Sequence, residues 1–213
     1  MTSREKEHLC ELMAAVFSPP AAEGIEQIRR EGFILEESVK HWGGDAALLF
    51  GLKTAGEAEA LSSDLRGEYD RLFGGKTGDS APLVESCYKP WTQDGECHLS
   101  FAREKGLLMG DPALHMAHIF RHSGLEVPKP FQACPDHLVL ELEFLSVLYG
   151  NATDREVKQF IQDHLDWVPQ MKRDLNQLCP HPFYRSAAEL LDGFLRHEKN
   201  RLETRDDGKK SLY

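Results

Sequence analysis

Asp136 and His137 form the adjacent pair of residues in this chain that is best suited to chemistry. A carboxylate binds cations, and a histidine titrates near neutral pH, so it can donate or accept a proton. The pair precedes an apolar stretch, 138–149, that also contains Glu141 and Glu143. Acids in an apolar helix need a partner or a wet groove. The residues alone leave two interpretations open: the pair caps and packs the helix, or it lies at the mouth of a peptide-binding groove.

His115, His118 and His122 make a second candidate set, because their spacing places them on one narrow arc of a helix. Together with the Cys-His pair at 97–98, such an arc could hold zinc or iron. The arc lies opposite the apolar face of the same helix, however. We therefore expect a solvated histidine edge and no metal ligands.

The chain contains no recognisable motif for nucleophilic catalysis or phosphate transfer. There is no GxSxG sequence, and the glycines of 74–78 lack the spacing of a phosphate-binding loop. Glu85 and Ser86 could be combined with the distant Asp136 and His137 into a triad, but a chain of this size always offers such a set. We therefore predict no catalytic residue and no cofactor.

The overall charge favours some partners over others. The 213 residues include 25 basic and 35 acidic side chains, a net charge of −10, and 41% are hydrophobic. Nucleic-acid binding requires a basic surface, so nucleic acid is not expected as a partner. The acidic balance fits a basic partner such as an arginine-bearing peptide, or serves only to keep the surface solvated.

The cysteines and the apolar segments indicate a cytoplasmic protein. The five cysteines are odd in number, widely spread and without a CxxC motif, which does not suggest a disulfide framework. Charged residues begin at Arg4 and no apolar N-terminal core follows, so no secretory signal is expected. No uninterrupted apolar run approaches the roughly 18 residues of a membrane span, and stable membrane insertion is not expected.

Hydrophobic periodicity predicts helices along most of the chain and no alternating strand. Glycines interrupt residues 32–56, where we expect only short helices around 39–42 and 46–50. Residues 74–111 should form a long irregular loop, with a short helix near 100–105. A capping box at 153–156 should open the helix that follows it. The main predicted helices span 4–17, 57–73, 111–123, 135–149, 153–165, 167–178 and 183–198, and residues 21–31 form a weaker helical patch.

These helices predict an all-α fold, a single bundle of about seven main helices with the irregular loop at about 74–111. Residues 1–200 should form one domain. The polar tail 201–213 should be frayed.

The order of several short segments resembles the TorD/DmsD/NarJ family of cytoplasmic chaperones for molybdenum-dependent redox enzymes. The resemblance runs from about residue 5 to 198. Residues 89–106 look like an insertion relative to shorter members, and Pro82-Leu83-Val84 replaces the family's Pro-Pro-Tyr. The segments that carry the resemblance are Tyr69-Asp70-Arg71-Leu72-Phe73-Gly74, Glu85-Ser86-Cys87-Tyr88, Leu108-Met109-Gly110-Asp111-Pro112-Ala113, Pro135-Asp136-His137-Leu138 with Glu141-Leu142-Glu143-Phe144, His164-Leu165-Asp166-Trp167-Val168-Pro169 and Pro182-Phe183-Tyr184.

The resemblance implies a non-catalytic role. Such proteins bind the N-terminal, often twin-arginine, signal peptide of a molybdopterin-dependent oxidoreductase and hold the apoenzyme until its cofactor is inserted, before export. One alternative is a chaperone for a non-exported nitrate-reductase-type subunit. The alternative of a different class is a metal-dependent all-α hydrolase that uses the histidine edge. The resemblance also implies a monomer or a domain-swapped dimer.

A groove for a cationic and apolar peptide needs aromatic walls and carboxylates. We expect Tyr69, Phe73, Tyr88 and Trp91 as walls, although core packing is the simpler expectation for Phe73. Trp91, on a loop, is the stronger candidate for a contact. His137 would orient the peptide backbone. The remaining predicted peptide-binding residues are Glu85, Ser86, Asp136 and Glu141.

Overall fold

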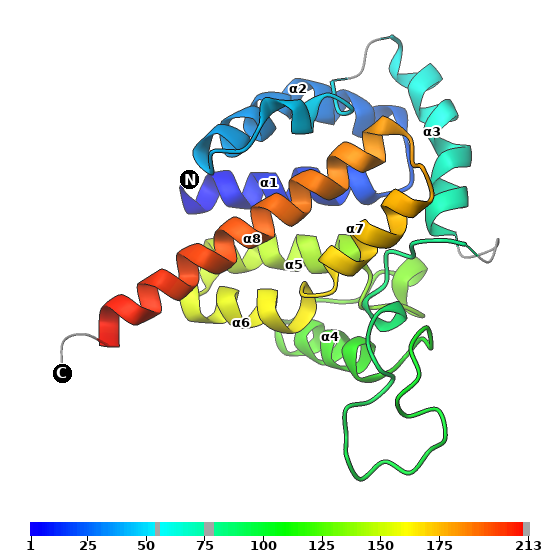
Figure 1. Ribbon diagram of the computed structural model, residues 1–213, viewed down its shortest axis with the longest axis vertical. Helices are drawn as coiled ribbons and strands as arrows, with labels where there is room; N and C mark the ends of the chain where they lie inside the picture. The colour runs from blue at the N-terminus through cyan, green and yellow to red at the C-terminus, as the bar shows by residue number, and fades with distance from the viewer. Residues whose placement is uncertain (54–55, 75–78, 211–213) are drawn as a thin grey trace.

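The computed structural model describes residues 1–53, 56–74 and 79–210, and side chains up to residue 204 (Figure 1). These residues form eight α-helices and three short 3₁₀ helices, and no β-strand occurs among them. The prediction of an all-α bundle is confirmed. The elements are α1 (Ser3–Phe17), α2 (Ala22–His41), η1 (Ala46–Leu49), α3 (Ala58–Phe73), η2 (Glu85–Cys87), α4 (Asp111–His122), η3 (Lys129–Phe131), α5 (Leu138–Asn151), α6 (Asp154–His164), α7 (Val168–Gln177) and α8 (Pro182–Lys210).

The core is centred on the packing of α1 against α5. Helices α2, α1, α5 and α6 lie side by side in that order, and α8 crosses over them (Figure 1). Helix α5 is apolar on nearly every side, which suits a helix enclosed by neighbours. Its Leu138, Leu142 and Leu145 are fully buried, as are Leu9 and Leu12 of α1. None of the described helices has the length and apolarity needed to cross a membrane.

Side-chain caps define the start of several helices. Thr2 and Glu5 form a reciprocal capping box at α1, and Thr153 and Glu156 form the predicted one at α6. Each box gives a partner to backbone N–H groups that have none within the helix. Helix α5 uses a histidine instead, since the His137 side chain accepts a hydrogen bond from the backbone N–H of Val139.

Three predicted boundaries are wrong. Helix α2 continues through Gly32 to His41, because Leu35 and Val39 on its second half are buried against the core and outweigh the weak helix propensity of glycine. Helix α5 begins at Leu138, so the residues at 135–136 precede it. Helix α8 extends beyond the predicted end at 198, as far as Lys210.

Residues 89–110 form a projecting segment, here called the arm (Figure 1, green, bottom). Backbone N–H groups of Trp91 and Thr92 donate to the carbonyl oxygens of Glu104 and Ala102, both at 2.9 Å. The rings of Trp91 and Phe101 pack edge to face at 5.1 Å. The arm is therefore an internally bonded loop, and the short helix predicted near 100–105 is replaced by turns.

Candidate functional site

Two of the motif-bearing stretches meet through their backbones. The Leu138 N–H donates to the Leu83 carbonyl at 2.8 Å, and the Glu85 N–H donates to the Asp136 carbonyl at 3.0 Å. These bonds flank an isolated antiparallel bridge between Val84 and His137. The pairing places the segment before η2 directly beside the start of α5.

Asp136 lies inside the protein and not at a groove rim, so that expectation is wrong. Its side chain is fully buried, and one carboxylate oxygen, Oδ2, accepts hydrogen bonds from the backbone N–H of Ser86, at 2.8 Å, and from the Ser86 hydroxyl. Burial raises the pKa of Asp136, while the two Ser86 bonds act in the opposite direction. Asp136 thus fixes η2 against the start of α5.

His137 is half-buried and acts as the cap of α5. Its Nδ1 accepts the Val139 N–H at 3.2 Å, and its ring packs 4.9 Å from the ring of Phe131. Burial lowers the pKa of His137 to about 4. A neutral ring with an unprotonated Nδ1 is the form that can accept this bond.

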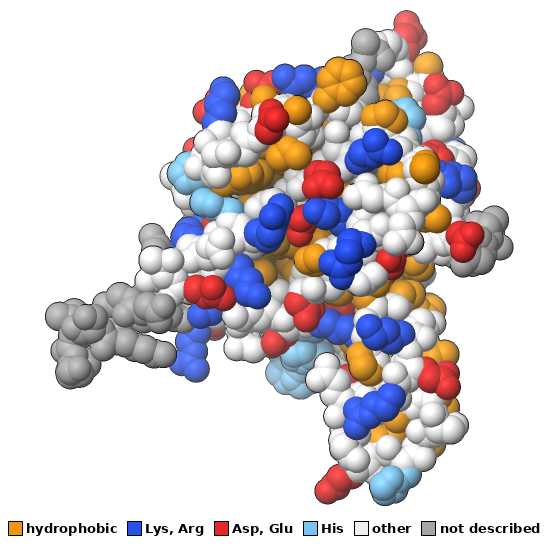
Figure 2. Space-filling view, in the orientation of Figure 1, with side chains coloured by type: hydrophobic (Ala, Val, Ile, Leu, Met, Phe, Trp, Pro, Cys, Tyr) orange, Lys and Arg blue, Asp and Glu red, His pale blue; other side chains and the backbone are white. Residues whose placement is uncertain are grey.

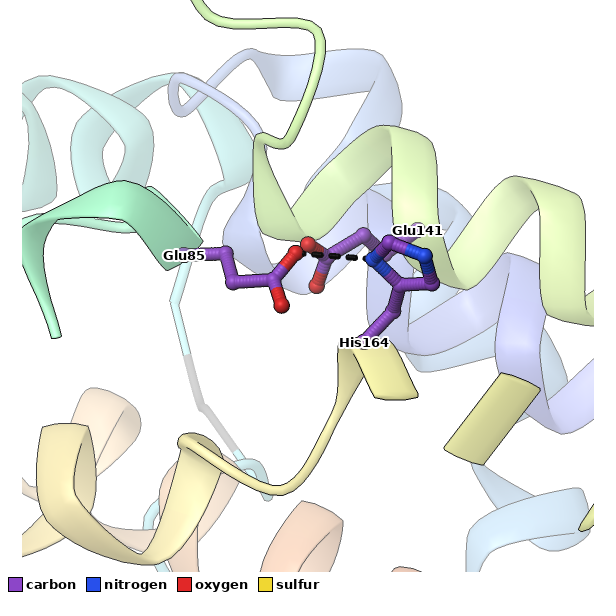
Figure 3. A group of neighbouring side chains, drawn as sticks. All are labelled: Glu85, Glu141 and His164. Carbon is purple, nitrogen blue, oxygen red and sulfur yellow. Dashed lines mark hydrogen bonds and ion pairs between the residues drawn. The ribbon is translucent and has the colours of Figure 1, made fainter. Parts of the chain in front are cut away.

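A chain of contacting polar side chains runs from η2 to α4, buried at Glu85 and His164 and exposed at His115. Glu85 is 1% exposed, and its Oε2 lies 2.8 Å from Nδ1 of His164 (Figure 3). Nε2 of His164 lies 2.8 Å from Nδ1 of His115. On the other side, the Lys89 ammonium is 2.6 Å from Oε1 of Glu85. These contacts join three segments that are far apart in sequence: residues 85–89, α4 and α6.

Glu141 lies beside this chain and is fully buried. Figure 3 shows its carboxyl group next to those of Glu85 and the ring of His164. Its Oε2 accepts a hydrogen bond from Trp167 Nε1 at 3.2 Å, whereas Oε1 has no hydrogen-bond partner among the described residues. Burial, followed by the nearby carboxylates of Glu85 and Asp136, raises the pKa of Glu141 well above its usual value. The burial of Glu141 and its acidic neighbours thus favour the uncharged form of its carboxyl group.

A groove with a volume of about 810 Å³ lies between the end of α3, the segment around η2, the arm and α7. The ring of Tyr88, 8% exposed, stacks on Trp167 at 5.0 Å. The groove combines apolar walls with a few charged and amide groups. Its lining residues are Phe73, Gly74, Ser80, Pro82, Val84, Cys87, Tyr88, Lys105, Gly106, Leu108, Gln170 and Asp174.

The predicted residues occupy different positions around this groove. Phe73 and Tyr88 line it. Tyr69 packs against Phe73 with ring centroids 5.1 Å apart and donates its hydroxyl to the Phe17 carbonyl. Trp91 instead packs within the arm, and Ser86 is buried. Peptide binding by these residues stays a prediction.

Several groove residues were missing from the prediction. Asp174 and Gln170 come from α7, and Lys105 and Leu108 come from the arm. The sequence contains one signal for them, since an apolar pair at 108–109 in a glycine-rich loop suggests a contact surface. The two α7 residues read as an ordinary polar helix face.

The histidine edge does not converge on a single point. His118 and His122 are exposed, with ring centroids 3.8 Å apart on the outer face of α4. His115 turns instead toward His164 of α6. All three histidines are exposed, so the expected solvated edge is confirmed, and His115 has the additional contact with His164.

Three comparisons place the chain among known proteins. The family model described as "Nitrate reductase delta subunit" matches residues 35–173. The protein named "Chaperone protein TorD" from Vibrio parahaemolyticus is 33% identical over 105 residues, which are 44% of this chain and 49% of that protein. Its counterpart from Vibrio cholerae is 29% identical over 118 residues, 50% of this chain and 54% of that protein. The chain thus spans about half the length of the curated relatives it matches.

A solved structure supports the fold over nearly the whole chain. A crystal structure from Archaeoglobus fulgidus, described as "a putative redox enzyme maturation protein", matches with a TM-score of 0.56 and 22% identity. The match covers 93% of both chains. At this identity the likeness concerns the fold alone.

Proposed function

The chain belongs to the nitrate reductase delta subunit family, and from this premise we propose that it is a non-catalytic cytoplasmic chaperone. Its client would be the apo form of a molybdopterin-dependent oxidoreductase subunit. The chain would bind the N-terminal twin-arginine signal peptide of that client and assist cofactor insertion before export. The names of its chaperone relatives support the general role.

The observation that carries the proposal is the groove of about 810 Å³ beside η2. Phe73, Val84 and Leu108 offer apolar walls that suit the hydrophobic part of a signal peptide. Asp174 offers a carboxylate within the same groove, which suits an arginine. The net charge of −10 adds a long-range attraction for a cationic peptide.

The buried acids have a different part in this proposal. Glu85, Asp136 and Glu141 are at most 1% exposed, so they do not meet an arginine directly in this conformation. Asp136 and Glu85 instead anchor η2 through hydrogen bonds and an ion pair. By holding η2 in place, Asp136 and Glu85 would maintain the shape of the groove.

A chaperone for a non-exported nitrate-reductase-type subunit is the second candidate function. The description of the matching family model favours it. Such a client lacks the twin-arginine leader, so the same groove would take a different N-terminal segment. Co-purification of the client from the native host under anaerobic growth separates the two candidates.

Calorimetry with a synthetic twin-arginine leader, from a molybdoenzyme encoded beside this gene, tests the proposal. We expect the Leu108→Ser variant to weaken binding about tenfold, because a buried leucine contributes about 1.5 kcal/mol. Leu99→Ser is a matched control, since Leu99 and Leu108 are 50% and 47% exposed on the same arm and only Leu108 lines the groove.

The outcomes of this experiment differ in meaning. Binding that L108S weakens and L99S leaves intact supports the groove. Equal binding by both variants and the unmodified chain would mean that the peptide binds outside this groove. No binding of any leader, together with co-purification of no molybdoenzyme, would reject the chaperone role.

A further inference from the structure

We propose that Glu85, Glu141 and His164 form a binding site for one divalent transition-metal ion, of the class of Zn²⁺ or Mn²⁺. The site is separate from the groove, whose lining residues include none of the three. The inference therefore stands or fails independently of the client peptide.

The three side chains have the geometry of a ligand set. They come from η2, α5 and α6, and one ligand atom of each lies within 4.8 Å of the others (Figure 3). All three are at most 2% exposed. Oε1 of Glu141 has no hydrogen-bond partner among the described residues, although a buried carboxyl oxygen normally has one. A metal ion at this point would supply the missing partner.

Neighbouring groups orient two of the three ligands, His164 and Glu141. His115 Nδ1 contacts Nε2 of His164, which leaves Nδ1 of His164 directed at the carboxylates. Trp167 donates to Oε2 of Glu141 at 3.2 Å. Metal-binding histidines and carboxylates are usually oriented by such outer contacts. The arrangement leaves one nitrogen and two oxygens facing inward.

A polar pocket gives a path to this cluster. Its volume is about 360 Å³, and Glu85, His164 and His115 are among its lining residues. Asp111 and Asp163 are exposed lining residues of the same pocket and would attract a cation. The pocket thus reaches two of the three proposed ligands, Glu85 and His164.

The donor atoms indicate the class of ion. Two carboxylate oxygens and one imidazole nitrogen suit Zn²⁺, Mn²⁺ or Fe²⁺ better than Cu⁺, which prefers sulfur ligands. Three protein ligands leave a coordination position for water. Lys89, 2.6 Å from Glu85, is the competing cation.

The test uses the full chain, purified without a histidine tag, stripped with a chelator and titrated with Zn²⁺ alone and Mn²⁺ alone. The exposed pair is first removed by His118→Ala and His122→Ala, because it could bind Zn²⁺ adventitiously. We expect one ion per chain by calorimetry, a rise in Tm, and proton release into the buffer, since ligands bind metal without their protons.

Glu141→Gln and Glu143→Gln form the matched pair of variants. Both residues lie on α5, but Glu143 is exposed. E141Q should abolish the rise in Tm and weaken binding at least about tenfold, whereas E143Q should bind as the parent does. If E141Q does not fold, His115→Ala replaces it, because His115 is exposed and orients His164; a loss of about 10- to 100-fold is then expected. Absence of stoichiometric binding in the parent, or binding unchanged in E141Q or H115A, overturns the proposal.

Discussion

His137 and Asp136 are adjacent in sequence and have different structural tasks. The first caps α5 through a ring nitrogen, and the second holds η2 through a carboxylate oxygen. Capping needs a neutral imidazole, and a buried carboxylate needs donors close by. The residue types at 136–137 indicated a structural or binding role, but not which partners each would find, because Ser86 reaches Asp136 only through tertiary folding.

The cap makes stability depend on pH. Burial lowers the pKa of His137 to about 4, below its usual value near 6.5. The unfolded chain takes up a proton as the pH falls below about 6.5, and the folded chain does not until about 4, so His137 lowers the free energy of unfolding across this window. Between pH 6.5 and 4, His137 should lower the free energy of unfolding of the parent chain by on the order of 1–3 kcal/mol. We expect the His137→Asn variant, which keeps a capping oxygen, not to show this decrease.

Urea unfolding of both chains at several pH values measures this difference. The comparison with the variant is needed because Asp136 and Glu141 change stability in the opposite direction. Their pKa values are raised in the folded chain, so their contribution to the free energy of unfolding decreases as the pH rises. Parallel pH profiles for the two chains would contradict the assignment of the cap.

Removal of the Asp136 carboxylate should destabilise the fold. Asp136→Ala leaves the buried N–H and hydroxyl of Ser86 without an acceptor, which should cost about 2–3 kcal/mol. Ser86→Ala removes only one of the two bonds and should cost about 1 kcal/mol. Urea denaturation at pH 7 gives both values, and equal effects would argue against this pairing. A loss of peptide binding in D136A would therefore not identify a direct contact.

At the scale of elements, helix positions follow from periodicity and caps, whereas loops depend on contacts distant in sequence. The apolar spacing in α1, α3 and α6 and the capping box at Thr153 were sufficient to place those helices. The end of α2 was predicted too early because glycine has a weak helix propensity at position 32. The packing of α2 against α1 keeps the helix intact past this residue. The arm had no periodic signal, and its hydrogen bonds to Trp91 and Thr92 were not predictable.

Two glycine substitutions should have opposite effects on these elements. A Cβ at Gly110 would lie 2.4 Å from the Trp91 carbonyl oxygen, so Gly110→Ala should displace the base of the arm and cost more than about 1 kcal/mol. A Cβ at Gly32 meets nothing within 4 Å, so Gly32→Ala should stabilise α2 by about 0.5–1 kcal/mol. Thermal unfolding gives the signs, and hydrogen exchange should show faster exchange in the arm of G110A alone. A stable G110A with an unchanged arm would refute the close approach.

At the scale of the whole molecule, the all-α class and the family were predictable, and the family match over residues 35–173 confirms the resemblance. The buried cluster of Glu85, Glu141 and His164 was not predictable from the sequence, because Glu85 and His164 are 79 positions apart and neither belongs to a metal-binding motif. Figure 2 shows mixed acidic and basic side chains on one face, and hydrophobic ones among them on the projecting lower part. The composition predicts the sign of the net charge, but it does not predict which acidic residues are buried, because that depends on the fold.

One buried carboxylate joins four helices of the bundle. Glu198 of α8 is fully buried and lies 2.8 Å from Lys6 of α1. The hydroxyl of Tyr149 in α5 also donates to it, and Arg201 links it to Asp154 of α6. Burial alone would raise the pKa of Glu198, but the hydrogen bonds from Arg201 and Lys6 lower it below its usual value. Glu198 is therefore charged and fully paired.

Glu198→Ala should cost about 3–5 kcal/mol in the free energy of unfolding, because it leaves the buried Lys6 ammonium without its partner. Glu189→Ala is the matched control on the same helix, since Glu189 also pairs with a lysine, Lys172, but is 33% exposed. An exposed pair of this kind contributes at most about 1 kcal/mol. Urea unfolding at neutral pH compares the two variants. If E198A were no less stable than E189A, the packing of α1 on α5 would hold the bundle without this ion pair. The larger loss in E198A would instead show that charge, together with apolar burial, fixes how α8 crosses the other helices.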